Sequence, residues 1–153
     1  MDVDDRLAAL EARVAALESA REPGERPAAT GGGAVGYTGD VALHGEITWQ
    51  IGYDAAAVAT LPADAIALVL AALGHSARIE VVQELLRGPR TAAELLELVD
   101  GGSKGQLYHH LSALTAAGVV RKQARGTYSV APQKVVPALI AMLSAADIAD
   151  LVR

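Results

Sequence analysis

The chain has 153 residues, 52% of them hydrophobic, with a formal net charge of −5 and no cysteine. This length holds one hydrophobic core of ordinary size plus accessory elements, and the lack of cysteine excludes a disulfide framework and a thiolate sensor. Because no apolar run approaches the length of a membrane span and the acidic N-terminus does not have the pattern of a signal peptide, we expect a cytoplasmic protein without a membrane partner.

Residues 1–22 predict a coiled-coil helix that pairs with a second copy of the chain. The apolar residues recur at alternating spacings of four and three, as in the a and d positions of a two-stranded coiled coil; they are Val3, Leu7, Leu10, Val14 and Leu17. Arginines at the g positions and glutamates at the e positions favour a parallel pair. The alternative is an amphipathic helix packed on its own domain. A Pro- and Gly-rich stretch over residues 23–34 predicts a flexible linker, which favours pairing between chains.

Residues 35–54 predict a β-hairpin, because apolar residues there alternate with polar or small ones. A three-residue loop, His44-Gly45-Glu46, gathers the apolar side chains on one face, whereas a two-residue loop splits them across both faces. Trp49 and Tyr53 are candidates for a ligand or oligomer contact. The alternative, which we favour, is a structural flap over the core, since an isolated hairpin is marginally stable in water.

Residues 60–131 predict a winged helix-turn-helix domain. Pro62 opens a first helix that Gly74 ends, and Ser76 is expected to cap a second helix that reaches Leu86. Apolar spacing assigns a buried stripe to each of these two scaffold helices; the residues are Ile66, Val69, Leu70 and Leu73, then Ile79, Val82, Leu85 and Leu86.

Two capping boxes define the helix-turn-helix itself. Thr91 stands three residues before Glu94, and Ser103 stands three residues before Gln106, each ahead of an apolar run. Gly118 is expected to end the second of these helices. Two short β-type runs, residues 119–123 and 127–130, then predict a hairpin wing that turns at Arg125-Gly126.

The second helix predicts a surface that binds double-stranded DNA. Its leucines share one face, and small or hydrogen-bonding residues occupy the opposite face and the helix start. Residues 75–131 carry seven bases and five acids while residues 1–74 carry four bases and eleven acids, and no acid occurs from residue 101 to 146. An ordinary solvated helix would mix charges of both signs, so this distribution favours DNA binding. The candidate contacts are Ser103, Lys104, Gln106, Tyr108, His109, Ser112, Arg121, Lys122 and Arg125.

Residues 132–153 predict a last helix with a broad apolar stripe, on which Leu139 and Leu143 are candidate dimerisation residues. A separate short helix starting at Ser144 is an alternative for its end. The four histidines are dispersed, except that His109 and His110 are adjacent, and neighbours on a helix diverge by roughly 100°. The sequence therefore predicts no metal site, no cofactor and no enzyme, since no catalytic motif is present either.

Four fragments in this order resemble ArsR-type winged-helix transcriptional regulators. They are Leu73-Gly74-His75-Ser76-Ala77-Arg78, Glu94-Leu95, Gln106 to Leu111, and Ala117-Gly118-Val119-Val120, within about residues 65–130. The resemblance implies a homodimer that binds a palindromic operator, usually as a repressor. Many members of that family sense metals through cysteines, and this part of the pattern is missing here. The fold class we expect is mainly α with small β elements. The alternative function is a protein-interaction module whose winged helix binds protein instead of DNA.

Overall fold

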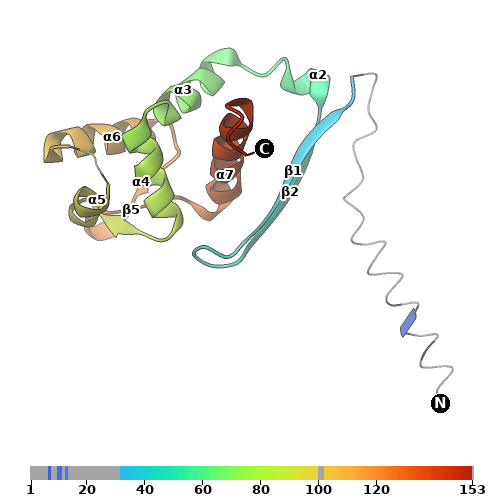
Figure 1. Ribbon diagram of the computed structural model, residues 1–153, viewed down its shortest axis with the longest axis horizontal. Coiled ribbons are helices and arrows are strands. Elements are labelled where there is room, and N and C mark those ends of the chain that lie inside the picture. The colour runs from blue at the N-terminus through green and yellow to red at the C-terminus, as the bar shows by residue number, and fades with distance from the viewer. Residues whose placement is uncertain (1–6, 8–9, 12, 14–31, 100–101, 153) are drawn as a thin grey trace. The chain divides into compact units, whose positions relative to one another are not determined.

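The computed structural model describes residue 7, residues 10, 11 and 13, and residues 32–99 and 102–152 (Figure 1). Most of the predicted coiled-coil helix and of the linker lies outside the described residues. By its internal contacts the chain divides into two units. Unit 1 is Met1–Tyr37 with Gln50–Thr60, and unit 2 is Thr38–Trp49 with Leu61–Arg153.

The described part of unit 1 contains the open end of a hairpin and a single turn of helix. Strand β1 (Ala34–Val41) pairs with strand β2 (Ile47–Asp54), and both strands continue into unit 2. The Asp54 carboxylate caps α2 (Ala55–Val58) by accepting hydrogen bonds from the backbone N–H groups of Ala56 at 2.8 Å and Ala57 at 3.1 Å. The sequence pattern did not predict this short helix.

The hairpin is present as predicted, but its loop is longer. The strands end at Val41 and resume at Ile47, so residues 42–46 form a five-residue loop instead of the three-residue loop His44-Gly45-Glu46. Both loops have an odd number of residues, so the apolar side chains of the two strands still share one face of the hairpin. In unit 2, Val41 and Ile47 accordingly pack against the hydrophobic core.

The two scaffold helices of unit 2 are α3 (Ala63–Leu73) and α4 (Ser76–Leu86). Pro62 precedes α3 and Gly74 follows it, as predicted, but His75 and not Ser76 is the N-cap of α4. The predicted buried stripe of α3 is wrong in part, because Ile66 is 41% exposed and Leu70 is 59% exposed. Periodicity identifies residues that share a face, and in this chain that face is covered only toward its C-terminal end, where Leu73 is buried and Val69 packs partly against the core.

The helix-turn-helix consists of α5 (Ala92–Leu98) and α6 (Lys104–Ala116), and both predicted capping boxes are formed. At the first box, Glu94 accepts hydrogen bonds from the backbone N–H and the hydroxyl of Thr91, at 2.7 and 2.8 Å. These bonds, the backbone one most strongly, lower the pKa of Glu94. Gly118 lies just beyond the end of α6 with a φ of 71°, which a residue with a side chain adopts only with strain.

The wing has three strands where the sequence predicted two. Strands β4 (Arg121–Lys122) and β5 (Thr127–Ser129) pair antiparallel, and β3 (Arg90–Thr91) pairs with the other edge of β5. Between β4 and β5, the short 3-10 turn η1 (Ala124–Gly126) reverses the chain. Arg125 and Gly126 both have positive φ there, which confirms the predicted position of the turn.

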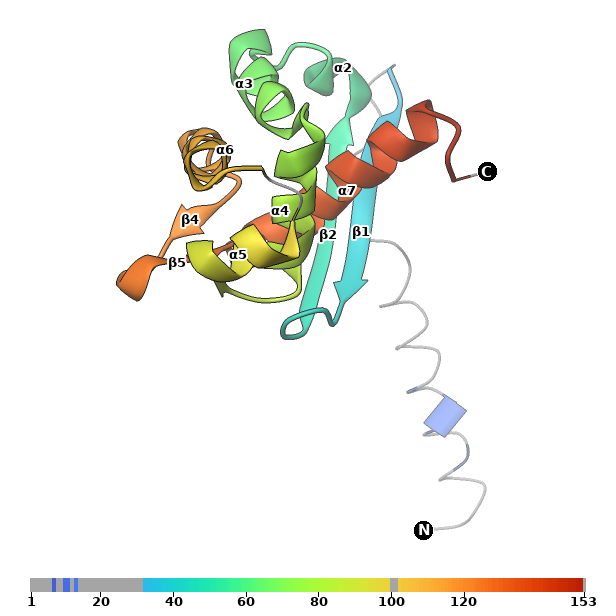
Figure 2. The ribbon, with the colours of Figure 1, turned by 60° about the vertical axis from the view of Figure 1, so that its left-hand side comes forward.

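The last helix, α7 (Pro132–Ile148), is shorter than predicted and continuous through Ser144, so no separate helix starts there. Its N-terminal half buries Val135, Val136 and Ala138, whereas Ile148, at its last position, is 84% exposed. In unit 2, α6 and the wing lie on one side of α4 and α7 lies on the other (Figure 2).

One hydrophobic cluster unites the elements of unit 2. Its buried members come from α3 to α7 and from the wing. The members with almost no exposed surface are Leu95, Leu107, Leu111, Leu114, Val81 and Val82. Of the described helices, none alone combines the length and the apolar character that a membrane crossing requires; α3 and α4 meet both conditions only as a pair, which is bent by 87°.

Gly39 provides a test of how the hairpin tip rests on α7. A Cβ atom at this position would lie 2.6 and 2.8 Å from the two methyl carbons of Val136, closer than such atoms can approach. We expect Gly39→Ala to lower the free energy of unfolding by about 1–3 kcal/mol, as overpacking does. In denaturant titrations the exposed neighbour Thr38→Ala serves as the control and should have little effect.

The same contact makes the effect of Gly39→Ala dependent on residue 136. In a chain that already carries Val136→Ala, the methyl carbons are gone, so Gly39→Ala should be distinctly less destabilising than in the original chain. Equal losses in the two backgrounds would show that the hairpin does not rest on α7 at Val136.

Candidate nucleic-acid interface

The recognition surface of α6 follows from which of its faces is buried. Leu107, Leu111 and Leu114 have at most 1% of their surface exposed, so they lock the rotation of the helix about its axis. Burying each such side chain contributes about 1.5–3 kcal/mol. On the opposite face four residues are exposed: Gly105, His109, Ser112 and Ala116. Small side chains on this face leave room for another backbone to approach closely.

The helix start combines exposed polar groups with a structural task. Lys104 and Tyr108 are exposed, and Tyr108 presents 45% of its surface. Gln106 is also exposed, but its Oε1 accepts a hydrogen bond from the backbone N–H of Ser103 at 2.8 Å. The Ser103 Oγ in turn accepts one from the Gln106 N–H at 3.3 Å. A bidentate contact of the Gln106 amide with adenine would therefore open the capping box.

The wing carries three exposed cations. Arg121 in β4 donates from Nε to the Ser129 hydroxyl at 3.2 Å, which orients its guanidinium across the strand pair. The Lys122 ammonium lies 6.0 Å from the centroid of the Tyr128 ring, at the outer limit of a cation–π contact. Arg125 occupies the turn itself. The cations thus lie on β4 and on the turn between β4 and β5, and β4 lies next to α6 (Figure 2).

The charge distribution separates these cations from neutralising acids. From residue 101 to 146 the sequence has no aspartate or glutamate. Arg87 forms a salt bridge with Glu84 at the C-terminal end of α4, outside this surface. The wing cations therefore keep their charge available for a polyanion such as DNA.

Three histidines gather beside the start of α6. The rings of His75 and His110 have centroids 4.7 Å apart, and the His109 ring lies 6.2 Å from that of His110. All three line a shallow depression together with Gly105 and Gln106. No group of three or more metal-ligating side chains has the geometry of a metal site among the residues that the structure describes.

His110 is buried, and its Nδ1 has no hydrogen-bond partner among the described residues. Burial lowers the pKa of His110, and the neighbouring His75, Arg78 and His109 lower it further. The neutral imidazole is therefore the form that the fold accommodates.

The remaining predicted contact residues lie on β2 and on α7. Trp49 lies in unit 2 with its indole Nε1 buried and without a partner, while Tyr53 lies in unit 1 and is 47% exposed. On α7, Leu139 packs partly against the core, and Leu143 is 52% exposed. Sequence reasoning also missed a pocket to which the hairpin loop, α4, the wing and α7 each contribute residues. No local sequence motif predicts this pocket, since its residues come from four separate segments.

The lowered pKa of His110 predicts a pH-dependent stability. In the unfolded chain this histidine takes up a proton near pH 6.5, but in the folded chain it does so only at lower pH. The stability contribution is thus complete above about pH 6.5 and is lost as the pH falls toward the folded pKa. His110→Leu, which cannot titrate, should flatten this decline in denaturant titrations between pH 7.5 and 5, within the usual working range.

His109→Ala is the matched control, because it removes the exposed histidine next to His110 and leaves His110 in place. This variant should keep the decline below pH 6.5. A decline of the same size in His110→Leu would assign the pH dependence to another group.

Comparisons with known proteins give one family match and several similar solved structures. Residues 73–123 match a family model described as a helix-turn-helix domain. Similar solved structures include an ArsR-like transcriptional regulator from Rhodococcus sp. RHA1, with 27% identity, 57% of this chain and 84% of that chain covered, and a TM-score of 0.43. They also include Rv0081 from M. tuberculosis, with 30% identity, coverage of 59% and 96%, and a TM-score of 0.48.

A third similar structure is the transcriptional repressor BigR from Xylella fastidiosa, with 24% identity, coverage of 54% and 87%, and a TM-score of 0.44. No curated protein matches the chain. The segment matched by the helix-turn-helix model contains α4, α5, α6 and β4, so it includes the α6 surface, Arg121 and Lys122, while Arg125 lies just beyond it. Residues 73–123 thus contain a helix-turn-helix domain, as the two capping boxes predicted.

Proposed function

We propose that this protein is a DNA-binding transcriptional regulator, a cytoplasmic repressor that acts as a homodimer on a palindromic operator. The observation that carries the proposal is the exposed face of α6 beside a wing with three cations and no acid. An α-helix fits the major groove of B-DNA, and the small residues on the exposed face of α6 permit close contact with base edges.

The proposed contacts divide into two classes. Gln106, Tyr108, His109 and Ser112 face base edges, because they lie on the exposed surface of α6 and carry hydrogen-bonding groups. Ser103, Lys104 and the wing cations Arg121, Lys122 and Arg125 face the phosphate backbone or the adjacent minor groove. Contacts of the second class raise affinity for every sequence, whereas those of the first class select the operator.

The proposed dimer uses the apolar surface that α7 leaves uncovered. Leu143 and Ile148 are 52% and 84% exposed, and Leu151, beyond the helix end, is 76% exposed. Large apolar side chains that are this exposed are what a second protein chain would cover, and this supports the proposed dimer surface. A parallel coiled coil of residues 1–22, with its seam at Val3, Leu7, Leu10, Val14 and Leu17, would add a second link between the two chains.

The proposed contacts predict different effects on specific and nonspecific DNA binding. His109→Ala should lower the preference for the operator more than the affinity for random duplex DNA, since it removes a base contact. Arg125→Ala should weaken both about equally and flatten the salt dependence by about one unit, since it removes one phosphate contact. Fluorescence anisotropy with fragments selected from genomic DNA measures both quantities.

Arg87→Ala is the charge-matched control, because this arginine is already paired with Glu84. It should leave the salt dependence unchanged. Gln106 needs a separate variant, since Gln106→Ala also removes a capping bond. Gln106→Glu keeps an acceptor for the Ser103 N–H but loses the amide donor, so a loss of operator preference without a loss of helix stability would mark a base contact. Binding that does not depend on salt or on these residues would favour a protein-interaction module.

The proposed dimer surface predicts the effect of a charge on α7. Leu143→Glu should shift the protein from dimer to monomer in sedimentation analysis, because a dimer would bury the carboxylate without a partner. Ser144→Glu adds the same charge at the next position, which is rotated by roughly 100°, and should leave the dimer intact. If both variants remain dimeric, the dimer interface does not include this part of α7.

A further inference from the structure

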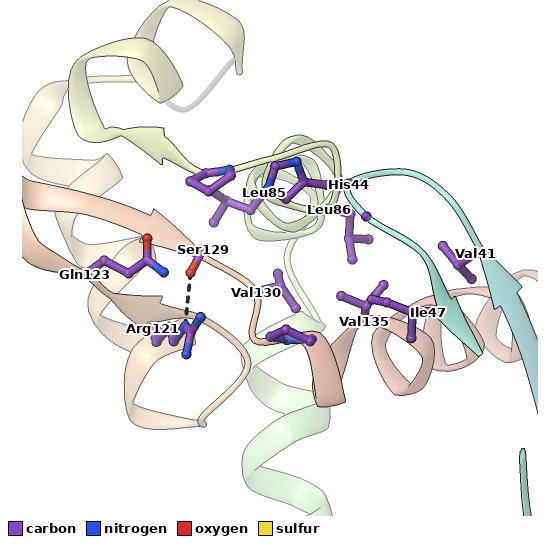
Figure 3. Close-up of a pocket in the computed structure, with 13 residues that line it drawn as sticks. Val41, His44, Ile47, Leu85, Leu86, Arg121, Gln123, Ser129, Val130 and Val135 are labelled. Atoms are coloured by element: carbon purple, nitrogen blue, oxygen red, sulfur yellow. Dashed lines mark hydrogen bonds between the residues drawn. The ribbon is translucent and has the colours of Figure 1, made fainter. Parts of the chain in front are cut away.

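A pocket of about 150 Å³ lies where the hairpin loop, the end of α4, the wing and the start of α7 meet within unit 2 (Figure 3). Neither the helix-turn-helix nor the proposed dimer surface accounts for it. Its lining residues are Val41, His44, Gly45, Ile47, Leu85, Leu86, Pro89, Arg121, Gln123, Ser129, Val130, Pro132 and Val135.

The hairpin loop closes one side of this pocket. Val41 and Ile47 pack on the core on either side of the loop. The His44 ring lies against the backbone of Gly88, where a Cβ atom would be 3.5 Å from its Nδ1. Gly88 has a φ of 149°, a conformation that favours glycine, so no side chain separates this turn from the ring. These contacts give the loop a defined place, and the pocket beneath it a defined shape.

The two ends of the pocket differ in chemistry. Figure 3 shows Arg121, Gln123 and Ser129 together at one end, and Val41, Ile47 and Val135 at the other. None of the described residues that line it is acidic, and Arg121 is its one permanently charged group. A ligand that satisfies both ends therefore needs an anionic head and a compact apolar body.

The polar end offers several hydrogen-bond donors to an anion. Arg121 uses its Nε to bind the Ser129 hydroxyl oxygen at 3.2 Å, which leaves the guanidinium Nη groups as donors. Because Ser129 Oγ accepts this bond, its own O–H can donate. The amide of Gln123, which lines the same end, adds another donor. Donors of this kind match the two oxygens of a carboxylate.

We propose that this pocket binds a small monocarboxylic acid with a single-ring or equally compact apolar body. A cavity of about 150 Å³ lined by apolar side chains holds one benzene molecule. The acid's carboxylate binds Arg121, Ser129 and Gln123, and its ring packs against Leu86, Val130 and Val135.

The site couples to DNA through Arg121, an inference that rests on the proposed function. Arg121 and Ser129 are paired positions of β4 and β5, so a ligand on both acts directly on the wing. A guanidinium that binds a carboxylate in the pocket is withdrawn from a DNA phosphate. By linkage, the acid then lowers DNA affinity and DNA lowers acid affinity by the same factor.

Calorimetry with benzoate, in the absence of DNA, tests the site on the full-length protein. Benzoate should bind with one site per chain, and benzyl alcohol and benzylamine, which lack the anionic head, should bind at least about tenfold more weakly. Arg121→Gln should weaken benzoate by at least about tenfold as well, because it removes the charge-assisted bonds. The matched control Arg125→Gln removes a wing arginine that does not line the pocket and should leave benzoate affinity unchanged.

A second variant tests the apolar end. Val41→Phe fills the pocket and should also weaken benzoate binding. Circular dichroism shows whether this variant is folded. If it is unfolded, the result for Arg121→Gln alone tests the site, because the Arg121 side chain is exposed and its replacement leaves the core intact. No benzoate binding at millimolar concentration, equal binding of benzyl alcohol, or equal losses in Arg121→Gln and Arg125→Gln would each overturn the proposal.

The regulatory arm is measured separately, as the affinity for duplex DNA with and without saturating benzoate. We expect benzoate to weaken DNA binding by the original chain at least about fivefold, in the usual range of coupling between sites. If the protein binds benzoate but no DNA, the proposed function fails and the site stands. If it binds both without mutual effect, the assignment of Arg121 as the shared residue is overturned.

Discussion

Burial of three leucines on one face of α6 is the constraint on which the rest of the structure depends. Leu107, Leu111 and Leu114 pack into the cluster that α3, α4, α5 and the wing share. A rotation of α6 about its axis by one residue position would expose these leucines and bury polar side chains. It would cost several kcal/mol, since burial of each leucine contributes about 1.5–3 kcal/mol. Burial of the leucine face therefore determines which residues of α6 are exposed to solvent.

The same cluster positions the wing. Directly after Gly118, Val119 and Val120 are buried, and their burial carries the chain from the end of α6 to Arg121. Tyr128 and Val130 are buried on the returning side, so both strands of the wing are attached to the core at their bases. One continuous apolar interior thus sets the distance between the exposed face of α6 and the wing cations. A rigid spacing of this kind suits a duplex, whose grooves and phosphates also have fixed spacing.

The parts of the fold that were predictable from the sequence are those with local causes. A capping box needs only a hydroxyl and an amide or carboxylate three residues apart, and both boxes formed where Thr91 and Ser103 indicated. The turn at Arg125 and the end of α6 at Gly118 were local in the same sense. The predicted winged helix-turn-helix followed from these signals in order along the chain.

What sequence reasoning missed depends on partners far away in the chain. Strand β3 has two residues and exists because Arg90 and Thr91 pair with β5, so no run of β-type residues announces it. The exposure of Ile66 and Leu70 on α3 depends on what covers that helix, and periodicity does not contain this information. At the candidate site, the spacing that makes Gln106 a capping residue also makes it a candidate base contact, and only the bond to Ser103 reveals the conflict.

The turn of the wing has an arginine where the backbone would favour glycine. Arg125 has a φ of 61°, in the left-handed region, and a residue with a side chain pays on the order of 1 kcal/mol to stay there. Glycine would relax this turn but has no charge. Thermodynamic stability and positive charge are therefore opposed at a single residue. Selection for heat resistance alone would drive the protein toward a more stable wing without a cation at its turn.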